Sequence, residues 1–175
     1  MEIETDPFTA IFAKLWEMVE RHPRLPEMVK PGNRIKLNKP NDRNPTKEHV
    51  QEADLPELLL TTDGGTVRLH NTSSSTKVVR RYSWIVSTGD QRVNYKLYPV
   101  EWLLVEALAD WQTQISPLTF KEKTFAKRLD VLDVNEGWTR PENRNIKGWS
   151  ALWKCEIEMH FKTQDLIDAL TPPTP

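Results

Sequence analysis

Residues 76–113 read TKVVRRYSWIVSTGDQRVNYKLYPVEWLLVEALADWQT, and two hydrophobic periods follow one another within them. In the first third, apolar and aromatic side chains alternate with polar ones, which is the period of a β-strand. In the last third, apolar side chains recur about every 3.6 residues, which is the period of an α-helix. The sequence therefore predicts a central strand and, shortly after it, the helix that packs against its sheet.

The predicted strand has one apolar face and one mixed face. The apolar face carries Val78, Tyr82, Trp84 and Val86, and the mixed face carries Val79, Arg81, Ser83, Ile85 and Ser87. β-Branched and aromatic side chains in this pattern fit a pleated, half-buried surface. Residues 88–91, TGDQ, have the chemistry of a turn.

The helix that follows is predicted to begin at Pro99, where a missing N–H costs nothing. Its main apolar stripe consists of Val100, Leu103, Leu104, Ala107, Leu108 and Trp111. Trp102, Val105 and Ala109 extend the apolar surface around the cylinder. A helix that is apolar on so many sides is expected to be mostly covered.

The chain before this stretch predicts one helix and several extended segments. Asp6 and Pro7 are typical of a helix start, and apolar residues continue at helical spacing as far as His22-Pro23. A short extended piece at 33–37 precedes a long exposed polar loop at 38–54. Residues 57–70, ELLLTTDGGTVRLH, predict a strand, a turn at Gly64-Gly65 and a second strand.

The chain after it predicts two more strands. The first lies around 129–134, and a polar connection at 135–148 follows it. In the second, residues 151–161 alternate between apolar and polar, so one face is buried and the other solvated. A short helix at 163–170 and a frayed tail complete the chain.

The order helix, strands, helix, strands predicts an α+β fold, in which a mainly antiparallel sheet is packed by an N-terminal helix and a central apolar helix. A doubly wound fold would need a regular alternation of strand and helix, which is missing. We expect a single domain at 1–170, with its long loop at 38–54, and a disordered tail at 171–175.

Composition argues against several classes of partner. The 175 residues include 24 basic and 25 acidic side chains, so the chain has no overall electrostatic footprint for nucleic acid or an anionic membrane. No apolar run approaches the roughly 20 residues that span a bilayer, and the opening MEIETDPF lacks the pattern of a signal peptide. We therefore expect an intracellular protein with no membrane partner and no sequence-specific nucleic-acid partner.

Cofactor motifs are missing as well. The chain has neither GxGxxG nor GxxxxGK[ST], and its four histidines, His22, His49, His70 and His160, share no metal-ligand spacing. The single cysteine, Cys155, lies on the apolar phase of its strand and is expected to be an inert buried thiol. We expect no cofactor.

Two charged groups leave alternatives open. Glu156 and Glu158, with Asp130 or Asp133 on a neighbouring strand, would suit a nuclease-type metal cluster, although paired acids on a strand's solvated side are ordinary. A basic patch for nucleic acid would consist of Arg80, Arg81, Arg92, Arg140, Arg144 and Lys147, although these side chains can equally be solvated or paired with acids.

Protein contact is the function that the polar loops favour. Trp138 lies in the second loop, outside any periodic pattern, and a tryptophan beside arginine is a typical interface anchor. The predicted protein-interface residues are Arg80, Arg92, Trp138, Arg140 and Arg144.

With its elements in this order, the sequence resembles the tail-completion or tail-terminator proteins of long-tailed bacteriophages and their prophage relatives. The resemblance lies in FTAIFAKLWEMV (8–19), YSWIVSTGDQRV (82–93), PVEWLLVEALADW (99–111) and WKCEIEMHF (153–161). The loop at 38–54 departs from the pattern.

The resemblance implies an α/β sandwich without catalysis that assembles into a ring, commonly of six subunits. The implied partners are further copies of the chain, the tail tube and head-connector proteins, first in the host cytoplasm and then in the virion. Such a ring needs complementary patches on opposite sides of each subunit. The alternatives are a small metal-dependent nuclease or hydrolase using Asp133, Glu156 and Glu158, and a bacterial adaptor domain that binds a protein through Trp138 and the loops.

Overall fold

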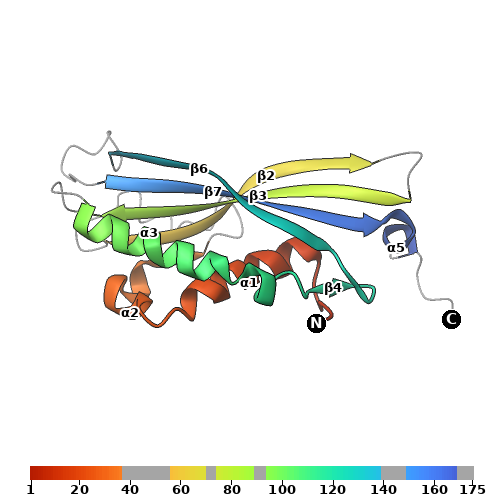
Figure 1. Ribbon diagram of the computed structural model, residues 1–175, viewed down its shortest axis with the longest axis horizontal. Helices are drawn as coiled ribbons and strands as arrows, with labels where there is room; N and C mark the ends of the chain where they lie inside the picture. The colour runs from red at the N-terminus through yellow and green to blue at the C-terminus, as the bar shows by residue number, and fades with distance from the viewer. Residues whose placement is uncertain (37–55, 70–73, 89–93, 139–148, 169–175) are drawn as a thin grey trace.

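The computed structural model describes residues 1–36, 56–69, 74–88, 94–138 and 149–168, and shows a long twisted sheet with helices on one face (Figure 1). The strands of the sheet, in spatial order, are β1 (Arg34–Lys36), β2 (Glu57–Leu69), β3 (Ser75–Thr88), β7 (Trp149–Lys162) and β6 (Ala126–Trp138). β1 runs parallel to β2, and every other pair of neighbours is antiparallel. The α+β class predicted from the sequence, with a mainly antiparallel sheet, is confirmed.

Two long helices, α1 (Pro7–Glu20) and α3 (Asn94–Ala109), lie beneath the same face of the sheet in Figure 1. The short elements are α2 (Leu25–Met28), η1 (Pro31–Asn33), α4 (Trp111–Gln114), β4 (Thr119–Phe120), β5 (Lys123–Thr124) and α5 (Thr163–Asp168). Asp6 caps α1 as predicted, because its Oδ1 accepts hydrogen bonds from the backbone N–H groups of Phe8 and Thr9, both at 3.0 Å. Among the described residues, no helix is long and apolar enough to cross a bilayer.

The core lies between the helices and the central strands. Tyr82 and Trp84, on the predicted apolar face of β3, are fully buried. Trp16 of α1 stacks on Trp84 with ring centroids 6.0 Å apart. β7 alternates as predicted and buries Ala151, Trp153, Cys155, Ile157, Met159 and Phe161. Burial raises the pKa of the Cys155 thiol to about 12, so it is inert at neutral pH.

The predicted turn at Gly64-Gly65 is wrong. β2 continues through both glycines as one strand, and Asp63 and Gly64 lie opposite the single Arg81 of β3 in a bulge. Gly64 has φ 71°, which glycine adopts without strain. A Cβ on Gly65 would lie 2.2 Å from the carbonyl oxygen of Val79, so glycine permits the close approach of the two strands. The pair of glycines therefore bends a strand here and does not reverse the chain.

The predicted start of the central helix at Pro99 is also wrong. α3 begins at Asn94, and Pro99 lies inside it. The extra first turn includes Leu97, which is fully buried, and this burial offsets the hydrogen bond that Pro99 cannot donate. The main stripe of this helix is buried from Val100 to Leu108, as expected, but Tyr98 and Trp102 on its other side are about half exposed, at 47% and 57%.

The last two strands are longer than predicted. β6 extends to Trp138, whose backbone pairs with Trp149 at the start of β7. Trp138 therefore lies in a strand, not in a polar loop, because pairing with β7 continues past Val134, where the predicted strand ended. The loop predicted at 38–54, the turn at 89–91 and the tail at 171–175 lie outside the described residues.

Candidate interaction surface

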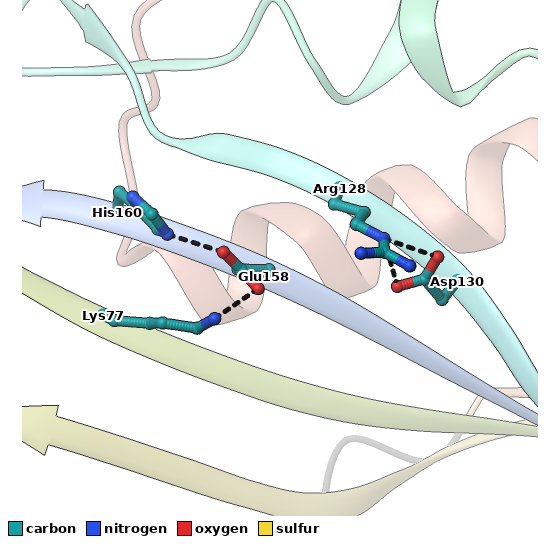
Figure 2. Close-up of polar contacts among 5 residues, drawn as sticks. All are labelled: Lys77, Arg128, Asp130, Glu158 and His160. Carbon is teal, nitrogen blue, oxygen red and sulfur yellow. Dashed lines mark hydrogen bonds and ion pairs between the residues drawn. The ribbon is translucent and has the colours of Figure 1, made fainter.

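The sheet face away from the helices carries a ladder of ion pairs (Figure 2). Glu158 of β7 lies between two basic side chains: its Oε2 pairs with Lys77 Nζ and its Oε1 lies 2.7 Å from His160 Nε2. On β6, Arg128 Nε lies 2.7 Å from Asp130 Oδ2. The hydrogen bonds from Lys77 and His160 hold the pKa of Glu158 below its ordinary value.

The carboxylates that suggested a metal cluster form hydrogen bonds and ion pairs on this face. Glu156 Oε2 accepts a hydrogen bond from Arg81 Nε at 3.0 Å, and Asp133 accepts one from the Asn135 amide. No group of three histidine, cysteine or acidic side chains suited to a metal ion occurs within the described ranges. The acids on this face lie within a ladder of cations and amides, so the geometry gives the hydrolase alternative no support.

Replacing Glu158 with glutamine is expected to remove a pH-dependent part of the stability. Because its pKa is lowered in the folded protein, the contribution of Glu158 is fully present above its ordinary value of 4.5 and is lost as pH falls through the lowered value. We expect the wild type to exceed the variant by about 0.5–1 kcal/mol near neutral pH, the range of partly exposed ion pairs. Urea unfolding of both proteins from about pH 7 to about pH 3 measures this difference, and a pH-independent difference would contradict the assignment.

The predicted interface residues have different positions in the structure. Arg80 lies on the helix-facing side of β3, with its guanidinium 5.2 Å from the centre of the Phe8 ring. Its Nε is buried. This arginine therefore packs against α1, where it holds the start of the helix to the sheet. The other three arginines, Arg92, Arg140 and Arg144, lie outside the described residues.

An exposed apolar stripe runs along α3. Tyr98, Trp102 and Val105 are 47%, 57% and 37% exposed, and their spacing of four and then three residues places them on one side of the helix. The main contacts of α3 are with α1, α2, β3 and β7, and β6 is not among these main partners. The stripe is therefore an apolar surface without a partner in the described part of the chain.

A second apolar row lies on the edge strand β6. Val131 and Val134 are 43% and 40% exposed, and they share the helix-facing side of the sheet with their register partners Cys155 and Trp153. Leu132, in the bulge between them, is 50% exposed. Within the described ranges, the two long helices cover the central strands and leave these three side chains exposed.

One hydrogen bond joins the helix that carries the stripe to the strand next to the row. Trp153, the register partner of Val134, donates its Nε1–H to Glu101 of α3 at 2.7 Å, which ties the helix to the sheet beside the edge. Tyr98 and Val105 flank Glu101 around the helix, whereas Trp102 lies toward Glu106, to which its Nε1–H donates a hydrogen bond at 2.7 Å. We call the six residues Tyr98, Trp102, Val105, Val131, Leu132 and Val134 the α3–β6 patch.

Sequence reasoning missed this patch, although one signal pointed toward it. Apolar side chains surround nearly the whole of α3, more than one sheet face can cover. That excess indicates a second buried side or an exposed one, and the sequence alone does not distinguish them. The prediction that Arg80, Arg92, Trp138, Arg140 and Arg144 form a protein interface stays untested.

No family model matches the chain, and no curated protein matches it. A similar solved structure is a chain of the "Virion of native gene transfer agent (GTA) particle". The two chains are 11% identical with a TM-score of 0.47, and the match covers 86% of this chain and 96% of that one. A match at this level does not assign the chain to a family.

Proposed function

We propose that this protein is a non-enzymatic structural component of a phage or prophage tail, where it forms a ring at the tail end that completes the tail and joins it to the head. The observation that carries the proposal is the α3–β6 patch, whose six large apolar side chains are 37–57% exposed. Exposed apolar side chains in such number are typical of a site of protein contact. Its position at one edge of the sheet suits a ring, because closure by rotation requires different surfaces on the two sides of each subunit.

Two further observations support this function. The order of elements that resembles tail-terminator proteins is present, with an opening helix, a central strand followed by its helix, and a closing hairpin of β6 and β7. The acids on the outer face of the sheet lie within ion pairs and amide contacts, which favours a scaffold over a hydrolase.

The partners that this function requires are further copies of the chain, the tail tube and a head-connector protein. The α3–β6 patch is proposed to contact a neighbouring copy. Arg80, Arg92, Trp138, Arg140 and Arg144 stay proposed as contact residues within the tail. The hexameric state belongs to the same proposal, as does the path from the host cytoplasm into the virion.

The purified full-length chain is expected to form closed rings of one subunit number. Mass photometry over a range of concentrations gives that number, and negative-stain electron microscopy shows whether the particles have a central hole. Replacing Trp102 and Val134 together by glutamate is expected to leave monomers whose melting temperature changes by only a few degrees, because both side chains are exposed.

The matched control for this experiment is Ile167→Glu, since Ile167 is 50% exposed on α5 and lies outside the patch. It should leave the rings intact. A wild-type chain that stays monomeric at every concentration, both alone and with tail tubes, would contradict the proposed function.

A further inference from the structure

The two edges of the sheet differ in how much of their length is free. On one side, β6 pairs only with β7 among the described strands. On the other side, β1 covers only Leu58–Leu60 of β2. The remainder of β2, beyond the bulge, extends along β3 without a second neighbour in the described part of the chain (Figure 1). Its Val67 is 59% exposed. The molecule thus has two free strand edges that face in opposite directions.

Along both free edges, a valine on the helix-facing side of the sheet is next to a charged residue on the other face. Val67 is on the helix-facing side of the sheet because it is opposite Val78, and Val134 is on the same side because it is opposite Trp153. Arg68 follows Val67 and lies on the other face, opposite Lys77. Asp133 precedes Val134 and also lies on that other face, opposite Lys154.

An antiparallel alignment that sets Val67 against Val134 brings these complementary groups together. It places Arg68 opposite Asp133 and Thr66 opposite Asn135, because antiparallel partners advance in opposite directions. Apolar then meets apolar, cation meets anion, and polar meets polar along the two edges.

The strand directions allow this alignment between identically oriented copies. β2, β3, β7 and β6 alternate in direction, so β2 and β6 of one molecule are antiparallel. A second copy, placed beside the first in the same orientation, therefore presents its β2 antiparallel to β6. This is the head-to-tail geometry that a ring requires.

We propose that the β6 edge of one copy pairs with the free part of β2 of a second copy, so that one antiparallel sheet continues through the assembly. The inference rests on the proposed ring and names the surfaces that close it. Val67 of the neighbour then lies beside Val134, on the helix-facing side of the sheet. The contact covers part of the α3–β6 patch.

The pairing includes an offset between neighbours. Within one copy, Val134 lies in the same row as Leu60, through Trp153 and Trp84, whereas the proposed partner of Val134 is Val67. Because the bulge adds one residue to β2, neighbouring copies are displaced by about six rows of the sheet, on the order of 20 Å. β1 accounts for the displacement, because it occupies the edge of β2 beside Leu60.

A cysteine pair tests the alignment directly. In the variant with Val67→Cys and Val134→Cys, mild oxidation is expected to give a ladder of disulfide-linked oligomers that collapses on reduction. The two positions cannot join within one molecule, since β3 and β7 separate their strands by roughly 14 Å and a disulfide needs Cα atoms within about 7 Å. The native thiol of Cys155 is fully buried and does not compete.

The matched control is the variant with Val67→Cys and Ile167→Cys, in which both cysteines are exposed but the second lies on α5. A ladder in the test pair that is no stronger than in this control would overturn the inference.

A charge exchange gives an independent test. Arg68→Asp and Asp133→Arg, each alone, are expected to weaken self-association roughly tenfold, and the combination should restore most of the loss. A double variant no better than either single variant would overturn the pairing. Rings of the wild type without a ladder would leave the proposed function standing and refute this interface. A ladder that grows into open filaments, without rings, would support the interface and contradict the ring at the tail end.

Discussion

Gly65→Ala is expected to lower the free energy of unfolding by about 2–4 kcal/mol, as in overpacking of a site that cannot relax. The added Cβ would lie 2.2 Å from the Val79 carbonyl oxygen and 3.1 Å from the Arg80 Cα. Both atoms belong to the backbone of β3, so no side-chain rotation relieves the clash, and β2 has to move away from β3. Urea unfolding followed by tryptophan fluorescence measures the loss.

Two other glycines provide matched controls. At Gly64 a Cβ meets no atom within 4 Å but φ is positive, so Gly64→Ala is expected to cost about 1 kcal/mol. At Gly32 a Cβ also meets nothing within 4 Å and φ is ordinary, so alanine should be close to neutral. A Gly65→Ala variant as stable as Gly32→Ala would contradict the close approach of β2 and β3 at the bulge.

Trp84→Ala is expected to cost about 3–5 kcal/mol, the range for removing a buried tryptophan side chain. Trp84 is fully buried at the centre of β3 and is stacked on Trp16, so its loss leaves a cavity between the sheet and α1. The same urea unfolding measures this cost.

Trp102→Ala separates stability from assembly. Trp102 is 57% exposed, so its removal should change the free energy of unfolding by less than about 1 kcal/mol while it weakens self-association. If Trp102→Ala destabilises the monomer as strongly as Trp84→Ala does, the stripe on α3 is a core surface and not a contact surface.

The alternating strands were predictable because the side-chain period of a strand is a local property. Tyr82 and Trp84 of β3 lie on the buried face that their spacing predicts, and so do Cys155 and Ile157 of β7. The start of α1 was predictable for a similar reason, since Asp6 bonds backbone groups only two and three residues further along.

The bulge in β2 and the true start of α3 were not predictable in this way. Gly64 and Gly65 suit a turn or a bulge equally, and pairing with β3 on both sides of them selects the bulge. Pro99 suits the first position of a helix, but burial of Leu97 against the sheet extends the helix by a turn before it.

The candidate interaction surface was likewise predictable only in part. Which side chains of a strand share a face depends on local chain geometry. For that reason the order of apolar, charged and polar residues along each free edge follows from the sequence. Whether a face is covered depends on how many strands two helices can shield. Val134 looks like a core residue by type, and it is exposed because the sheet is wider than the helix layer beneath it. Trp102 is exposed because it lies on the side of α3 opposite the buried stripe. Only the packing of elements far apart in the chain sets that width, so the two free edges and their match emerge from the assembled fold.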